Sequence, residues 1–229
     1  MRNKAYVVIF IIIVCGGIIG GIINTEKQAV AIEKDRIQLT QPDTKGSVSL
    51  EQAISKRRSQ RSFAKKELSL EQTSQLLWAS QGITGSKYGF SFRAAPSAGA
   101  LYPMEIYLLS KAGSFHYIPQ GHILEIKGRK DLRKALADSA LGQHAVADAA
   151  IDIVICAVYE RVTSKYKEHG RRYVHMEAGH IAQNIHLQAV ALGLGSAPIG
   201  AFDDKAVQKA LALPSDCQPL YIIPVGYTE

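Results

Sequence analysis

The stretch Ala149–Tyr159, with the sequence AAIDIVICAVY, decides the fold. It is an almost unbroken run of apolar and β-branched residues, too short for a helix that spans a membrane and typical of a strand buried on both faces. We therefore expect Ile151–Tyr159 to be a central strand of the sheet, covered by helices on its two sides.

A long helix follows this strand in the chain and is expected at Arg172–Leu192. Its apolar residues recur at steps of three and four, and Gly193 and Gly195 provide the stop. The recurring positions are Val174, Ala178, Ile181, Ile185, Ala189 and Leu192, and Leu187, Val190 and Ala191 widen the apolar surface beyond one stripe. We expect this helix to be buried on more than one side, within a core or a subunit interface.

The remaining elements alternate between helical and strand patterns. Helices are expected at 49–57, from Ser69 to near Gly82, at 129–139 and at 203–211, the first two beginning at serines that a glutamine follows three residues later. Strands are expected at 105–109, 115–118, 122–127 and 220–225, with the second and third forming a hairpin. This order predicts an α+β fold, an α/β sandwich, in one domain over residues 48–229.

The first 24 residues do not resemble a globular segment. Arg2 and Lys4 precede an uncharged apolar run from Ala5 to Ile23, which predicts a transmembrane anchor or a signal segment. The basic residues ahead of the run place the N-terminus in the cytoplasm and the domain across the membrane, either anchored or exported after signal cleavage. Residues 25–47 then form a linker.

The overall charge and the metal-ligand spacings exclude two function classes. The formal net charge of +7 is modest, and aromatic residues do not interleave with the basic ones, so nucleic-acid binding is not expected. Glu177 and His180 have the one ligand-like spacing in the long helix, and without a second such motif no metal site is expected.

A basic cluster follows the first predicted helix. The stretch ISKRRSQRSF, Ile54–Phe63, places Arg57, Arg58 and Arg61 within five residues of one another, with Ser59 among them. Cations at a helix C-terminus are common and need no ligand. The alternative is a phosphate clamp, since arginine presents a planar fork to phosphate oxygens and serine adds a hydroxyl donor.

Two segments of small residues bear on the phosphate-clamp alternative, because they could form the rest of a ligand site. The first, Arg93–Leu109, contains Pro96, Ser97 and Gly99 in a loop before a strand; the second, Gly193–Asp204, contains Pro198, Ile199, Gly200 and Ala201. Each is compatible with a plain connection. Small residues also let a flat ligand approach the backbone closely.

The order of these motifs resembles that of the FMN-dependent nitroreductase superfamily, and more narrowly of its SagB-type dehydrogenase branch. The resemblance rests on Arg-Arg-Ser-x-Arg, Pro-Ser-x-Gly-x-x-x-Pro, the helix EAGHIAQNIHLQAVALGLGS, PIGAF and PVGY, and it extends from about residue 49 to the end. It implies a central mixed sheet flanked by helices, and an intertwined homodimer with two FMN sites at the subunit interface.

The resemblance also implies roles for individual residues. Arg57, Ser59 and Arg61, with Arg58 nearby, would hold the FMN phosphate. Pro96, Ser97 and the loop through Gly99 would meet the flavin from the partner chain, and the backbone of Pro198–Ala201 would face the isoalloxazine ring. Lys165 and Tyr166 match a Lys-Tyr pair of the branch, so either could serve as general base, while a solvated lysine and a packing tyrosine are the plainer interpretation.

The implied activity is hydride transfer through flavin N5. It would either dehydrogenate a small-molecule or peptide substrate, or pass electrons from NAD(P)H, bound transiently, to a nitro or quinone acceptor. The alternative is a membrane-tethered flavin-binding or scaffold protein without turnover.

Overall fold

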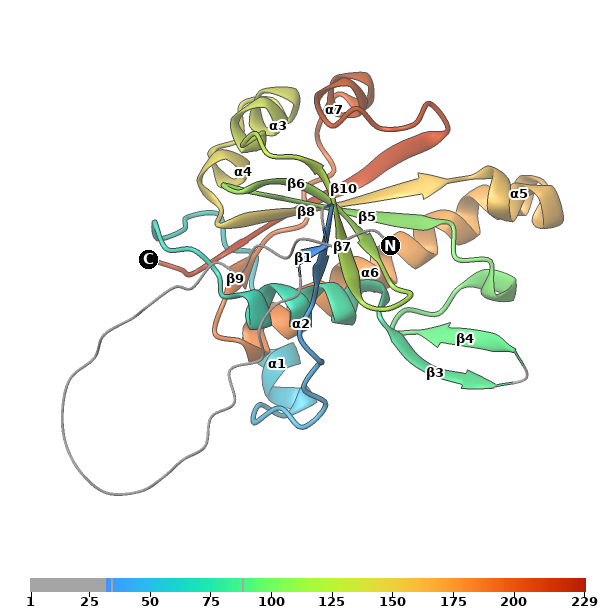
Figure 1. Ribbon diagram of the computed structural model, residues 1–229, viewed down its shortest axis with the longest axis horizontal. Helices are drawn as coiled ribbons and strands as arrows, with labels where there is room; N and C mark the ends of the chain where they lie inside the picture. The colour runs from blue at the N-terminus through green and yellow to red at the C-terminus, as the bar shows by residue number, and fades with distance from the viewer. Residues whose placement is uncertain (1–31, 34, 88) are drawn as a thin grey trace, which may run out of the picture.

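One sheet forms the centre of the protein, whose computed structural model describes residues 32–33, 35–87 and 89–229 (Figure 1). Eight strands of the described residues lie in the order β1-β2-β7-β6-β5-β8-β10-β9. Their bounds, in chain order, are β1 Ile32–Glu33, β2 Arg36–Gln38, β5 Met104–Ser110, β6 Gly113–Ile118, β7 Ile123–Gly128, β8 Ile151–Val158, β9 Gly195–Ser196 and β10 Cys217–Gly226.

Every neighbouring pair of strands in this sheet is antiparallel, so the expectation of a mixed sheet was wrong. The reason is the chain path, since β5, β6 and β7 follow one another through short turns and each later strand returns against its neighbour. Among the described residues, one parallel contact occurs, an isolated bridge between Ser59 and Ser196 at the β9 edge.

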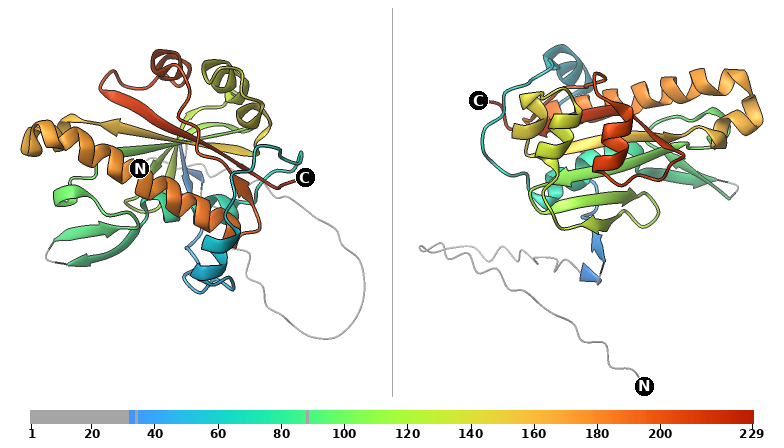
Figure 2. Two further views of the ribbon diagram at one scale, coloured as in Figure 1. Left: turned by 180° about the vertical axis from the view of Figure 1, so that it is seen from behind. Right: turned by 90° about the horizontal axis from the view of Figure 1, so that it is seen from above.

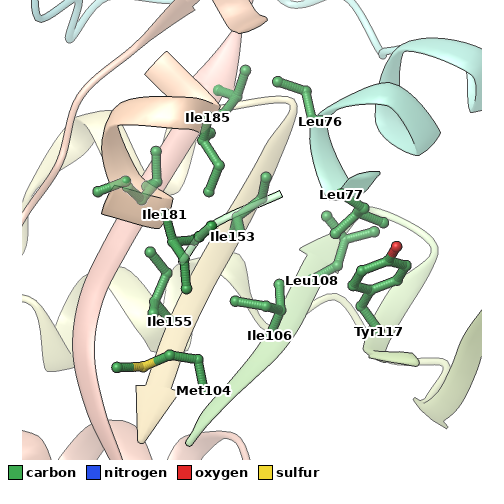
Figure 3. Packing of buried hydrophobic residues seen from close by; sticks show 14 of the residues in the cluster. Leu76, Leu77, Met104, Ile106, Leu108, Tyr117, Ile153, Ile155, Ile181 and Ile185 are labelled. Carbon is green, nitrogen blue, oxygen red and sulfur yellow. The ribbon is translucent and has the colours of Figure 1, made fainter. Parts of the chain in front are cut away.

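The central strand β8 contributes to hydrophobic packing on both faces of the sheet, as the sequence predicted. Ile153 and Ile155 belong to the cluster on one face, while Val154 and Cys156 belong to the cluster on the other. Figure 3 shows Ile153 and Ile155 meeting residues of two helices that cover the first face. Apolar residues therefore follow one another without alternation in β8 because both of its faces are buried.

Helices cover the two faces of the sheet and produce three layers (Figures 1 and 2). The helices on the first face are α2, Leu70–Gln81, and α6, Glu168–Ala191, with the short α1, Leu50–Lys56, beside α6. Those on the second face are α3, Arg133–Ser139, α4, His144–Asp148, and α7, Asp204–Ala210. This arrangement confirms the predicted α+β sandwich.

The expected helix ends are confirmed at the best-marked positions. Ser69 caps α2: its hydroxyl accepts a hydrogen bond from the Gln72 amide, and the side-chain oxygen of Gln72 accepts one from the Ser69 amide. At the C-terminus of α6, Gly193 has φ 70°, and the amide of Leu194 donates to the carbonyl of Ala189 at 2.8 Å. This pattern is a Schellman motif, which explains why a glycine ends the helix. The helix begins at Glu168, four residues earlier than predicted.

Several elements had no clear signal in the sequence. They are a two-stranded hairpin of β3, Ile83–Lys87, and β4, Phe90–Arg93, a 3-10 turn η1, Ala98–Ala100, and helix α5, Glu160–Tyr166. In addition, β2 pairs with β7, and the adjacent Leu39 packs in the core with 3% exposure. Part of the segment predicted as a linker, 25–47, is therefore an edge of the sheet.

The predicted membrane segment, residues 1–24, lies outside the described residues. Within 32–33, 35–87 and 89–229, no helix combines the length and the apolar character that crossing a bilayer requires. The N-terminal anchor or signal stays a prediction from the sequence.

Candidate functional site

The segment Arg57–Phe63 is attached to the β9 edge of the sheet. Arg57 ends α1, and after it the amide of Gln60 donates to the carbonyl of Ser196 at 2.9 Å. Phe63 then bridges Thr228 near the C-terminus. The basic cluster is therefore held on a rigid support rather than on a free loop.

The three arginines of this segment lack anionic partners. None of Arg57, Arg58 and Arg61 forms an ion pair with any described residue. Arg58 donates from Nη1 to the carbonyls of Ser55 and Arg57, at 3.1 and 2.7 Å, and Arg58, Ser59 and Arg61 are exposed. Cations gathered without a carboxylate favour binding of an external anion, and guanidinium groups with a serine hydroxyl suit a phosphate.

A buried histidine lies behind the basic cluster. His186 of α6 is 3% exposed, and its Nδ1 lies 2.8 Å from the hydroxyl of Ser196. Burial, together with the nearby charge of Arg57, lowers the pKa of His186 to about 4. The imidazole is therefore neutral at physiological pH, and it supports the strand on which the basic segment lies without adding charge.

The second small-residue segment runs along β10. Ile199 exchanges two backbone hydrogen bonds with Ile222, at 2.8 and 3.0 Å, while Gly200 and Ala201 are exposed. Neither amide of these two residues donates a hydrogen bond to another described residue. The segment thus presents backbone donors to solvent from the same sheet edge that carries the basic cluster.

The first small-residue loop lies beside the predicted Lys-Tyr pair. Gly99 has φ 64°, and a Cβ built on it would lie 2.8 Å from the Tyr166 hydroxyl and 3.1 Å from Lys165 Nζ. Both side chains come from α5, and Ser97 and the exposed Pro96 precede Gly99 in the loop. The structure therefore brings Pro96, Ser97, Gly99, Lys165 and Tyr166 together.

These two groups of candidate residues lie at different ends of α6. His186 contacts the support of the basic cluster, whereas Glu177 interacts with Ser97 of the loop. The two α6 residues are nine positions apart, about 14 Å along the helix axis at 1.5 Å per residue. Figures 1 and 2 show α5 at one end of the molecule and α1 with β9 at the other. The candidate residues of one chain therefore lie in two separate groups.

Comparison with known proteins identifies the family. The sequence model of the nitroreductase family matches residues 54–227, which include the basic cluster, both small-residue segments and α6. The chain belongs to the nitroreductase family. A nitroreductase-family protein of Methanocaldococcus jannaschii is 38% identical over 198 residues, which cover 84% of this chain and 97% of that protein. A nitroreductase crystal structure from Ralstonia eutropha has a TM-score of 0.76 and 30% identity, covering 87% of this chain and 93% of that one.

Two further proteins are similar to this chain over a smaller share of their length. The microcin B17-processing protein McbC of Escherichia coli is 29% identical over 132 residues, covering 53% of this chain and 48% of McbC. An NADPH:FMN oxidoreductase of Vibrio harveyi, crystallised with NAD⁺, has a TM-score of 0.59 at 22% identity and covers 79% of this chain and 69% of that one, which shows a shared fold. The nitroreductase fold and its association with oxidoreductase activity follow from these comparisons.

The sequence patterns did not place three polar residues next to the Pro96–Gly99 loop. Gln81, Arg93 and Glu177 form a bonded group behind Ser97, and Glu177 is 2% exposed. One signal was available, since Glu177 lies three residues after Val174 and four before Ile181, on the buried stripe of α6. A carboxyl at such a position needs partners, which is a reason to look for them.

Among the described residues, no group of three or more histidine, cysteine, aspartate or glutamate side chains is arranged to hold a metal ion. Glu177 interacts with Gln81 and Ser97 and is buried, while His180 is exposed. The Glu177–His180 spacing therefore carries no further weight as a metal motif.

Proposed function

We propose that this protein is an FMN-dependent oxidoreductase that transfers a hydride through flavin N5 and works as a homodimer. The observation that carries the proposal is the basic cluster. Arg57, Arg58 and Arg61 are fixed beside Ser59 on the sheet edge with no carboxylate partner among the described residues. Such a donor set fits a phosphate monoester, the charged end of FMN.

Other residues of the chain would contribute to the same ligand. The exposed amides of Gly200 and Ala201 are donors at the edge where a flavin held by the basic cluster would extend, and donors of this kind tune the electron affinity of a flavin. Pro96, Ser97 and Gly99 lie in a separate loop, near Glu177 of α6 rather than near His186. In this proposal they would meet the flavin of the second chain in a homodimer.

Bound FMN would supply the two-electron hydride chemistry. The chain itself would supply the proton-transfer group, for which we propose Lys165 or Tyr166. Both lie against Gly99, on the loop that would meet the flavin of the partner chain. An amine or phenol at that place can accept a proton from a substrate that loses a hydride.

Two substrate classes remain within the proposal. The similarity to McbC supports a SagB-type dehydrogenation of a peptide or small molecule. The fold shared with the Vibrio harveyi NADPH:FMN oxidoreductase supports reduction of a nitro or quinone acceptor, with NAD(P)H as a transient donor. We further propose that residues 1–24 direct the domain to or across a membrane, which rests on their sequence alone.

A titration with two flavins tests the phosphate clamp. FMN should bind the full-length protein about 100-fold more tightly than riboflavin, which lacks the phosphate, if two charge-assisted hydrogen bonds contribute about 1.5 kcal/mol each. The double variant Arg57→Ala/Arg61→Ala should lose this preference, and Arg129→Ala/Lys130→Ala, which removes two exposed charges elsewhere, should keep it. Equal affinity of the native protein for both flavins would contradict the clamp. Tight FMN binding without reduction by any donor would favour the flavin-binding scaffold.

A further inference from the structure

A closed ring of contacts lies behind the Pro96–Pro103 loop. Gln81 Nε2 donates to the Glu177 carboxyl at 3.2 Å, and Arg93 Nη1 donates to Gln81 Oε1 at 3.2 Å. The Arg93 guanidinium lies 4.4 Å from the centre of the Tyr102 ring, and the Tyr102 amide donates to the Ser97 hydroxyl at 2.9 Å. The Ser97 side chain in turn interacts with the Glu177 carboxyl and lowers its pKa. The ring ties α2, β4 and α6 to both ends of the loop.

The loop that the ring encloses has an unfavourable backbone. Gly99 has φ 64°, and the non-glycine residues Ala100 and Tyr102 have φ 53° and 47°. Left-handed conformations are unfavourable for a residue with a Cβ and persist where the surroundings hold them in place. Tyr102 is held by the hydrogen bond from its amide to Ser97, by the stacking of Arg93 on its ring, and by a hydrogen bond from Arg161 Nη1 to its carbonyl at 3.2 Å.

We propose that Glu177 is a positioning residue that holds the Pro96–Pro103 loop through Gln81 and Arg93, and that loss of the Glu177 proton tightens these contacts. The part of this inference that concerns flavin rests on the proposed function, because only there does the loop meet the cofactor. The part that concerns the loop applies to the protein without any ligand.

The surroundings of Glu177 favour a change of ionisation near neutral pH. Burial raises the pKa of Glu177 to about 7, against the lowering effect of Ser97, of Gln81 and of the charge on Arg93. Its ionised form accepts the hydrogen bond from Gln81 as a charge-assisted bond and attracts Arg93, whereas its neutral form accepts it as an ordinary bond.

Other charged groups reach the loop through two arginines. Glu105 of β5 and Arg161 of α5 both influence Arg93, and they pair with each other at 2.5 Å. Arg161 Nη1 also donates to the carbonyl of Tyr102 at 3.2 Å. His116 of β6 lies 2.6 Å from the other oxygen of Glu105, and a cavity of about 240 Å³ is lined by Gln81, Arg93, Glu105 and His116. Glu105 thus acts on the loop through Arg93 and Arg161, and the variant Glu177→Gln distinguishes the effects of the two carboxyls.

Hydrogen exchange of the loop tests the inference in the full-length protein without flavin. After correction for intrinsic rates, amides of residues 96–103, and that of Tyr102 above all, should exchange about fivefold more slowly at pH 8 than at pH 6, as expected when an ordinary hydrogen bond becomes charge-assisted. Glu177→Gln should abolish this difference, and Ser97→Ala should speed exchange at both pH values. Glu168→Gln, an exposed carboxyl on the same helix, should leave the difference unchanged. A pH difference that survives in Glu177→Gln, or its absence in the native protein, would overturn the inference.

A second measurement separates this inference from the flavin assignment. Trp78, the single tryptophan, lies one turn before Gln81 on α2, and its fluorescence should titrate near pH 7 in the native protein and not in Glu177→Gln. FMN uptake is then measured separately at pH 6 and pH 8. If the loop responds to pH but the protein takes up no FMN, the role of Glu177 is supported and the proposed function is contradicted. If the protein takes up FMN but neither the loop nor the Trp78 fluorescence responds to pH, only the role of Glu177 is contradicted.

Discussion

Asp152 and Glu177 are both buried carboxyl groups, but their surroundings differ. Glu177 accepts a hydrogen bond from Gln81, and Ser97 and the charge of Arg93 both lower its pKa. Asp152 in β8 is 0% exposed, and neither of its carboxyl oxygens has a hydrogen-bond partner among the described residues. Burial raises the pKa of Asp152 well above its usual range, so the folded protein holds it as a neutral acid.

The buried acid Asp152 predicts a pH dependence of stability. Because its folded pKa is above its unfolded value of about 3.9, its contribution to the free energy of unfolding falls as pH rises from about 4. Asp152→Asn removes this titration, so its free energy of unfolding, relative to that of the native protein, should be higher at pH 8 than at pH 5. Urea unfolding at pH 5 and pH 8 measures this difference. Asp148→Asn, an exposed neighbour, should show none, and an Asp152→Asn variant that keeps the native pH slope would refute the assignment.

Substitution of Gly99 should lower stability slightly but activity strongly. Gly99→Ala adds a Cβ at φ 64° against the ends of two flexible side chains, those of Lys165 and Tyr166, which can move aside. We expect a loss of about 1 kcal/mol from the backbone alone. Gly142→Ala, with φ 71° and no atom within 4 Å of the new Cβ, should lose the same amount.

Turnover should distinguish these two glycine variants. NADPH-dependent quinone reduction by the FMN-loaded protein should fall about tenfold or more in Gly99→Ala, because the candidate proton-transfer groups are displaced, and stay unchanged in Gly142→Ala. Equal activities would show that Lys165 and Tyr166 do not need their present positions for this reaction.

At the scale of the element, the α2 cap gives a local prediction. Ser69→Ala removes the side-chain acceptor for the Gln72 amide and leaves the capping box incomplete. The expected cost is about 1 kcal/mol, or a decrease in Tm of about 2–4 °C for a chain of this size. Ser215→Ala, at an exposed position outside the helices, should leave Tm unchanged when both are measured by thermal unfolding. An unchanged Tm in Ser69→Ala would mean that α2 is held by packing alone.

Elements with local signals were predictable from the sequence, and elements defined by distant partners were not. Ser69 and Gln72 mark α2, and Gly193 marks the end of α6, because caps depend on residues within one turn. The edge strand β2 has three residues and exists because β7 offers it a partner, which no local pattern reveals. Strand direction is also a property of the chain path, which explains the wrong expectation of a mixed sheet.

The same distinction applies to the candidate site. Arg57, Ser59 and Arg61 are close in the sequence, so their cluster could be predicted, whereas Gln81, Arg93 and Glu177 come together only through packing of α2, β4 and α6. Of these three residues, only Glu177 could have been noticed in the sequence, because it is a charged residue on the buried stripe of a helix. The roles assigned to the predicted residues stay predictions until a flavin is observed.

For the whole molecule, the two separate groups of candidate residues predict a dimer that involves α6. Met176 of α6 is 53% exposed, which is unusual for an apolar residue beside a buried stripe and suits an interface between subunits. Met176→Lys should weaken the dimer, seen as a concentration-dependent shift to monomer in light scattering, and should weaken FMN binding with it. Leu141→Lys changes a residue with 74% exposure between α3 and α4, on the other face of the sheet, and should do neither. A native protein that is monomeric yet binds FMN tightly would contradict the shared site.

The absorption spectrum of the full-length protein, purified without added flavin, tests the central claim most directly. We predict the bands of oxidised flavin, release of FMN on denaturation, and a colourless Arg57→Ala/Arg61→Ala variant that still folds. A native protein that is colourless and takes up no added FMN would contradict the account, and the basic cluster would then be an ordinary solvated helix end.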